Sequence, residues 1–335
     1  MEQMLEFSRI VPLYSDKYVF EEIIDARYIK KSKNNIYIPD FEYGKIIILD
    51  NNGHFIDSIF LLKDIKLGKV NIIDYDVFDE EICVICIVGH NYTPIICRYS
   101  NERKYIGKFE LDDVYYNVKI LSNNKVLLYS ADNNDSGYNY AIYDLKTKKK
   151  EAKWDSSNNE YCVHFQTPFN QVNSELLITK SFDNTIYTFT GNGMQPKINL
   201  LYQYTNKPPV INGACAKFRE IRERNLVNIV SEISSISESA NNLYLVTFIT
   251  SGRYSKSYLT SIDKTTNKTK TAELESDGSF SFADIKYLSL KNGYGIASAD
   301  MEKLKEYIRK QKLQNVYKDI MNSNANMAIV EFKLR

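Results

Sequence analysis

The sequence predicts an all-β fold, a six-bladed β-propeller built from four-stranded antiparallel blades. The first observation is a repeat: polar turn signals recur at intervals of 43 to 51 residues, with one longer interval of 68, near Asn34, Glu80, Asn123, Asn173, Asn241 and Asn292. The second is that each interval holds several short strand-forming runs separated by tight-turn residues. The third is that the last repeat lacks one strand. Repeats of this size and content are typical of propellers.

The amino-acid composition agrees with a large β-rich core. The 335 residues are 44% hydrophobic, and they include 26 Tyr and 16 Phe but only 13 Gly and 7 Pro. Aromatic residues favour strands, whereas a phosphate-binding α/β fold would need more glycine. The chain is also long enough for one large all-β domain.

The charge balance excludes some partners. There are 43 Lys and Arg residues against 42 Asp and Glu, a formal net charge of +1, so we expect no nucleic-acid partner. No apolar run is long enough for a membrane span. The start, MEQMLEFSRIVPL, lacks a basic segment followed by an apolar stretch, so we expect no secretory signal there. A cytoplasmic chain and an exported mature chain both remain open.

The cysteines do not form a disulfide framework, because they are odd in number and scattered: Cys83, Cys86, Cys97, Cys162 and Cys215. Cys83 and Cys86 form a C-x-x-C motif inside a predicted strand. Strand alternation places residues three apart on opposite faces, so we expect two buried thiols rather than a metal or redox pair.

The elements follow in order as one domain over residues 1–335. Blade one reads IIDARYIKK, NIYIPD, KIIILD and HFIDSIFLL, and blade two reads IIDYDVF, ICVICIV, PIICRY and YIGKFEL. Later blades repeat this order of four strands. The predicted segments are a closing strand at 5–13, blade one at 22–62, blade two at 70–111, blade three at 114–154, blade four at 161–203, an insertion at 204–228, blade five at 229–275 and blade six at 280–334.

The two chain ends are predicted to share blade six. Its strands FSFADIKYLSL, GYGIASA and MAIVEFKLR number only three, and MLEFSRIVPL can supply the fourth. This pairing would close the ring and leave no exposed strand edge. Between the second and third of these strands, residues 301–321 carry apolar residues at helical spacing, which predicts a helix whose apolar stripe packs on the propeller or docks a partner.

The chain resembles six-bladed, NHL-like β-propeller proteins of gut-dwelling anaerobic bacteria. The resemblance rests on IVPL, IYIPDFEYGKIIILDNNGHFIDSI with its D-x-x-G-x-F turn, NTIYTFTGNGMQPKINLLY and NANMAIVEFKLR. Members often carry a G-x-G-P-G-E-Y stretch after blade one, where this chain has LLKDIKLGKVNI. The resemblance implies the fold and a lipoprotein or exported protein, but no defined biochemical activity.

Each predicted inner strand opens with a polar residue, and these residues are candidate ligand-binding positions: Asp25, Asp74 or Asp76, Asn117, His164, Glu232 and Asp284. One residue per blade would form a mostly acidic ring at the channel mouth. Such a ring could hold a cation or hydrogen-bond a sugar or peptide, or the side chains could simply cap strand ends and bind turn amides. The insertion and the helix should open on the same face and partly cap that mouth.

Enzyme motifs are absent from the sequence. It holds no phosphate-binding glycine loop, no H-E-x-x-H and no G-x-S-x-G, and His54, His90 and His164 lack zinc-site spacing. We therefore expect neither a cofactor nor a bound metal. Two hypotheses remain: a non-enzymatic module binding a glycan, peptide or protein through the insertion-bearing face, or a hydrolase or lyase using the ring carboxylates, with or without a divalent cation.

Overall fold

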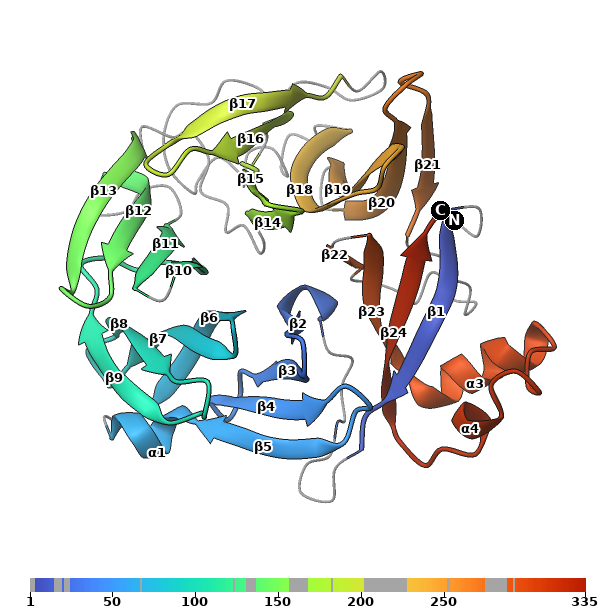
Figure 1. The fold of residues 1–335 in the computed structure, drawn as a ribbon, viewed down its shortest axis with the longest axis horizontal. Helices are drawn as coiled ribbons and strands as arrows, with labels where there is room; N and C mark the ends of the chain where they lie inside the picture. Colours follow the sequence, from blue (N-terminus) through green and yellow to red (C-terminus); the bar gives the residue numbers. More distant parts are fainter. Residues whose placement is uncertain are drawn as a thin grey trace.

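The computed structural model describes most of the chain. The described residues are 4–14, 20, 25–66, 68–122, 124–130, 137–156, 168–181, 183–201, 228–251, 254–274, 288–291 and 293–335. They form six four-stranded antiparallel sheets arranged as blades around a central axis (Figure 1). The predicted six-bladed propeller is therefore confirmed.

Each blade runs from an inner strand at the axis to an outer strand at the rim. Blades one to three contain β2 (Lys30–Lys31), β3 (Asn35–Asp40), β4 (Lys45–Asp50) and β5 (Phe55–Phe60); β6 (Val70–Phe78), β7 (Glu81–Val88), β8 (Thr93–Tyr99) and β9 (Tyr105–Glu110); and β10 (Asn117–Ser122), β11 (Lys125–Tyr129), β12 (Tyr138–Asp144) and β13 (Lys149–Ser156). Blades four to six contain β14 (Phe169–Val172), β15 (Glu175–Ile178), β16 (Thr185–Phe189) and β17 (Met194–Asn199); β18 (Ile229–Glu238), β19 (Asn242–Ser251), β20 (Tyr254–Asp263) and β21 (Thr269–Glu273); and β22 (Ser289–Lys291), β23 (Tyr294–Asp300), β24 (Met327–Leu334) and β1 (Leu5–Pro12).

The core lies between neighbouring blades, because each sheet buries both of its faces. In β7, Val84 and Cys86 pack toward blade one, while Cys83 and Ile85 pack toward blade three. The two thiols of the C-x-x-C motif therefore lie on opposite faces of the sheet, as alternation predicts. Burial raises the pKa of the Cys83 thiol, and a hydrogen bond with Cys97 together with burial raises that of Cys86, which suits inert core thiols.

The N-terminal strand closes the ring, as predicted. β1 pairs antiparallel with β24, with Leu5 opposite Leu334 and Val11 opposite Ile329. The N–H of Arg335 donates to the Met4 carbonyl at 3.0 Å. Blade six thus combines three strands from the C-terminal part of the chain with one from the N-terminus, a 3+1 arrangement. The strand β24 has a partner on each side, so neither of its edges is exposed.

The predicted helix at 301–321 is two helices, α3 (Met301–Lys310) and α4 (Lys318–Met321). Asp300 caps α3 by accepting from the Lys303 N–H at 2.9 Å. The first helix ends where Lys312 turns left-handed, at a φ of 56°, and the Leu313 N–H closes onto the Ile308 carbonyl.

Both helices lie at the outer rim of blade six, away from the axis (Figure 1). The apolar stripe of α3 packs on the propeller, where Leu304 and Ile308 are buried and the Tyr307 ring lies 5.5 Å from that of Phe7. The helices therefore do not cap the channel mouth, contrary to expectation. The predicted insertion at 204–228 falls, apart from Asn228, outside the described residues.

Blade one departs from its predicted pattern at both ends. Asp25 does not open a long inner strand; it caps a 3₁₀ turn, η1 (Ala26–Tyr28), and the inner strand is reduced to β2. After β5, a short helix, α1 (Leu61–Ile65), leads to blade two and ends at Lys66 in a left-handed conformation. Local hydrogen bonding by Asp25 competes with strand formation here.

Candidate functional site

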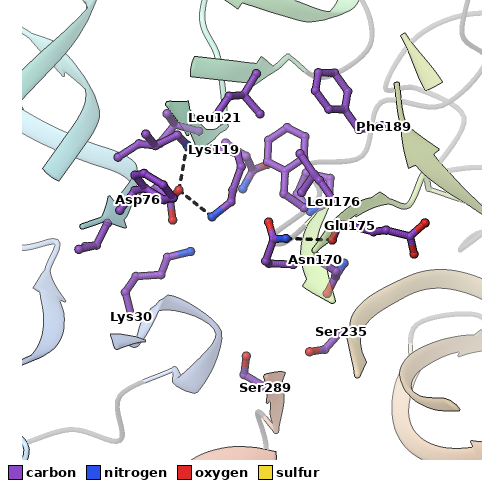
Figure 2. Close-up of a pocket in the computed structure, with 18 of the residues that line it drawn as sticks. Lys30, Asp76, Lys119, Leu121, Asn170, Glu175, Leu176, Phe189, Ser235 and Ser289 are labelled. Atoms are coloured by element: carbon purple, nitrogen blue, oxygen red, sulfur yellow. Dashed lines mark hydrogen bonds and ion pairs between the residues drawn. The ribbon is translucent and has the colours of Figure 1, made fainter. Parts of the chain in front are cut away.

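A central cavity of about 840 Å³ lies on the axis, with lining residues from all six blades. Every blade contributes at least one polar or charged residue to the lining, including Lys30, Asp76, Lys119, Asn170, Ser235 and Ser289 (Figure 2). Most lining residues come from the later parts of the inner strands and from the turns into the second strands, such as Phe78, Leu121 and Ser174. Its volume lies within the range of small-molecule sites, roughly 300–1,000 Å³.

The wall of the cavity is held together by side chains that bind the free edge of the next inner strand. An inner strand pairs with its own blade on one edge only, so the N–H groups of its other edge need acceptors. Asp74 Oδ2 accepts from the Val118 N–H at 3.0 Å, and Asp76 Oδ2 accepts from the Ile120 N–H at 2.9 Å. Both aspartates are thus part of the structure of the blade two to blade three contact.

The same device recurs around the ring. Asn170 of β14 accepts from the Ile236 N–H at 3.0 Å, and Ser235 of β18 accepts from the Leu290 N–H at 2.6 Å. Ser237 accepts from the Gly293 N–H at 2.8 Å. Because strand side chains alternate, every second residue of an inner strand can reach its neighbour in this way.

The two buried aspartates of β6 titrate differently. Burial raises the pKa of Asp74 to about 6, against the opposing effects of Lys30 and the Val118 N–H. Burial acts on Asp76 too, but the ammonium groups of Lys119 and Lys30 together with the Ile120 N–H outweigh it, and the pKa of Asp76 lies below its usual value. Lys119 Nζ lies 2.9 Å from Asp76 Oδ2. Asp76 is therefore a paired carboxylate, while Asp74 exchanges its proton closer to neutral pH.

Three of the predicted site residues line this cavity and two do not. Asp74, Asp76 and Asn117 are lining residues, and Asn117 Nδ2 lies 3.4 Å from Asp74 Oδ2. Asp25 and Glu232 are not among the lining residues; Arg27 binds Asp25, and its charge also interacts with that of Glu232. His164 and Asp284 lie outside the described residues.

Arg27 links blade one to blade five, although blade six stands between them in the ring. Its guanidinium binds Asp25 through Nε at 3.0 Å and Nη2 at 2.6 Å, and lies 5.6 Å from the centre of the Phe248 ring. Oε1 of Glu232 is buried with no hydrogen-bond partner among the described residues. Burial raises the pKa of Glu232 to about 7, with Arg27 opposing the rise and Asp25 adding to it.

The sequence did not single out Lys30, Lys119, Asn170, Ser235 or Ser289. The expected ring was mostly acidic and sat at strand starts, whereas the residues that face the cavity are of mixed charge. The sequence does distinguish two of them, because Lys30 and Lys119 are lysines within the predicted inner strands IIDARYIKK and YYNVKIL. A lysine at such a position needs either a partner or an aqueous space.

The described residues also bear on metal binding and on membrane insertion. In those parts of the chain, no group of three or more His, Cys, Asp or Glu side chains is arranged to hold a metal ion. No helix within the same residues has the length and apolar character needed to cross a membrane.

Comparison with known proteins finds similar structures only. No protein-family model matches the sequence, and no curated protein does. A predicted exported protein from Bacteroides fragilis is similar with a TM-score of 0.72 and 14% identity, over 100% of this chain and 96% of the other. A member of the DUF4221 family from Bacteroides vulgatus is similar with a TM-score of 0.61 and 11% identity, over 99% and 98% of the two chains. At these identities the likeness shows that the fold is shared across the whole chain.

Proposed function

We propose that this protein is a non-enzymatic binding module that holds a ligand in its central cavity. The observation that carries the proposal is the cavity itself, about 840 Å³ in volume and lined by polar groups from six blades. Asp74 and Asp76 hold its walls in place, so the site is preformed. A small glycan or the end of a peptide would fit the size and mixed polarity of the lining.

We infer that the ligand enters at the end of the channel where first strands turn into second strands. Phe78, Leu121 and Ser174 lie at these turns and line the cavity. This entrance differs from the one expected from the sequence, which was on the face that carries the insertions. We further propose that the protein acts outside the cytoplasm, by analogy with the predicted exported protein of similar fold.

A screen of neutral and charged small molecules by ligand-observed NMR would test cavity binding. Leu121→Trp fills the cavity, because Leu121 is a half-buried lining residue; Leu62→Trp is the matched control, since Leu62 is 40% exposed on α1. Compounds that bind the wild type should bind Leu62→Trp equally and Leu121→Trp at least about tenfold more weakly. Equal binding to all three proteins would place the ligand elsewhere and contradict the proposal.

A second candidate, a hydrolase or lyase, is favoured by one observation. Glu232 has a buried oxygen without a hydrogen-bond partner among the described residues and a pKa raised to about 7, as a general acid or base requires. A screen with chromogenic esters and glycosides tests it. Turnover that falls at least about a hundredfold in Glu232→Gln would support an enzyme, whereas turnover unaffected by that substitution would exclude Glu232 from the chemistry.

A further inference from the structure

We infer that the ligand of the central cavity is a small organic anion, whose negatively charged group binds the Lys30 ammonium; this rests on the cavity-binding function proposed above. Lys30 extends into the cavity from β2 (Figure 2). Its ammonium forms no hydrogen bond or ion pair with any described residue, and it lies 6.0 Å from the centre of the Tyr75 ring. It therefore offers three donors to a ligand.

The other charged side chains of the lining are already engaged. Lys119 binds Asp76, Lys31 binds Glu331 and Glu175 binds Lys197. Asp74 accepts from the Val118 N–H, and its pKa is raised, so it holds its charge less firmly than Asp76 does. Among the described residues of the lining, the charge left without a direct partner is thus the positive charge of Lys30.

Lys30 is more than a counter-ion for the two aspartates. Its positive charge acts to lower the pKa of both Asp74 and Asp76. However, no carboxylate oxygen of a described residue lies within 4.0 Å of the Lys30 ammonium, the limit for an ion pair. The strand amides and Lys119 bind the Oδ2 atoms instead. A ligand carboxylate could therefore form charge-assisted hydrogen bonds with Lys30 without displacing an existing contact.

The opposite side of the cavity carries a group of apolar side chains, which defines the rest of the ligand. Leu121, Leu176 and Phe189 of blades three and four lie together across the cavity from Lys30 (Figure 2), and Phe169 also belongs to the lining. Side chains of this kind pack against rings or hydrocarbon. A carboxylate attached to an apolar ring matches both sides of the cavity.

Isothermal titration calorimetry with two matched pairs of probes tests the inference: benzoate against benzyl alcohol, and glucuronate against glucose. In the wild type we expect benzoate to bind at least about tenfold more tightly than benzyl alcohol, and more tightly than glucuronate. Lys30→Met should abolish this preference and Lys30→Arg should keep it. Lys146→Met, at an exposed turn residue, is the control and should behave as the wild type.

Each outcome decides the inference. Equal affinity for acid and neutral probe, or a preference that survives in Lys30→Met, would overturn the anion while leaving cavity binding intact. Failure of all four probes to bind would also overturn it, and the small-molecule screen with Leu121→Trp would then decide cavity binding separately. A thermal melt of each variant excludes unfolding as the cause, and Lys30→Arg keeps the test valid if Lys30→Met is unstable.

Discussion

At the scale of single residues, Glu232 should make the stability of the protein depend on pH. Burial raises the pKa of Glu232 to about 7 from an ordinary value of 4.5. Between these two values the folded state holds a proton that the unfolded state has released, so the free energy of unfolding falls as the pH rises through that window. At about 1.4 kcal/mol per pKa unit, the loss at pH 8 amounts to as much as about 3 kcal/mol.

Glu232→Gln removes that loss, because a neutral amide replaces the buried carboxylate. We expect the variant to be more stable than the wild type at pH 8 and nearly equal to it at pH 4.5, by urea unfolding at both pH values. Glu110→Gln, at an exposed residue of β9, is the control. A difference between wild type and Glu232→Gln that is the same at both pH values would contradict the titration of Glu232.

Asp76 has a structural role that a single substitution can measure. Asp76→Ala leaves the Ile120 N–H and the Lys119 ammonium without their acceptor in a buried position, and should lower the free energy of unfolding by about 2–4 kcal/mol. Asp57→Ala is the matched control, since that side chain is 52% exposed, and should change stability by less than about 0.5 kcal/mol. Chemical denaturation at pH 7 gives both values; similar losses would refute the role.

These residues show why the site was only partly predictable. Polar residues on the inner strands were recognised, because Asp76, Asn117 and Glu232 interrupt apolar runs. Their function was not, because the hydrogen bonds of Asp76 and Asn117 cross from one blade to the next, between residues 44 and 43 positions apart. Such contacts depend on how neighbouring sheets align, which a strand pattern does not contain.

At the scale of elements, the break between α3 and α4 can be tested through one backbone position. Lys312 is left-handed, which costs an L-residue roughly 1 kcal/mol and glycine almost nothing. Lys312→Gly should therefore raise the free energy of unfolding by about 0.5–1 kcal/mol. Lys310→Gly, two residues earlier at the last helical residue of α3, should instead lower it, by up to about 1 kcal/mol. If thermal unfolding shows that both variants change the melting temperature in the same direction, this position of the helix end is contradicted.

The elements were predictable where the pattern is local. Turn residues at regular spacing marked most strand pairs, and the apolar stripe marked α3. The helix break was missed because Leu313, Val316 and Tyr317 continue the helical spacing past the left-handed Lys312. The 3₁₀ turn at Ala26–Tyr28 was missed because the side chain of Asp25, rather than the apolar periodicity, determines it.

At the scale of the whole molecule, closure of the ring was predictable because it follows from counting. Five complete units and one with three strands leave a single strand unassigned, and the N-terminus carries it. Counting strands cannot predict where the segments outside the blades pack. The helices between β23 and β24 lie at the rim instead of over the channel (Figure 1). The packing of Tyr307 on Phe7 holds α3 at the rim.

The way in which the two chain ends close blade six also predicts that a circular permutant with its new ends in another blade will fold. Arg335 can be joined to Met4 by a short Gly/Ser linker, since the two residues already share a hydrogen bond of 3.0 Å. New ends between Asn101 and Glu102, in the exposed turn before β9, would divide blade two into the same 3+1 arrangement that blade six has naturally. We expect this permutant to be monomeric and to lose less than about 2 kcal/mol in urea unfolding, because every strand keeps its partners.

The matched control is the same permutant without residues 105–110, which form β9. It leaves β8 as an unpaired edge and uncovers β8 positions such as Ile95 and Cys97, which in the native protein pair with Glu110 and Lys108 of β9. An exposed edge pairs with other chains, so the control should form oligomers in size-exclusion chromatography with light scattering. If the permutant with β9 intact aggregates as readily as the control, then the ring is not held by strand pairing within each blade, and the site on its axis would not be a rigid one.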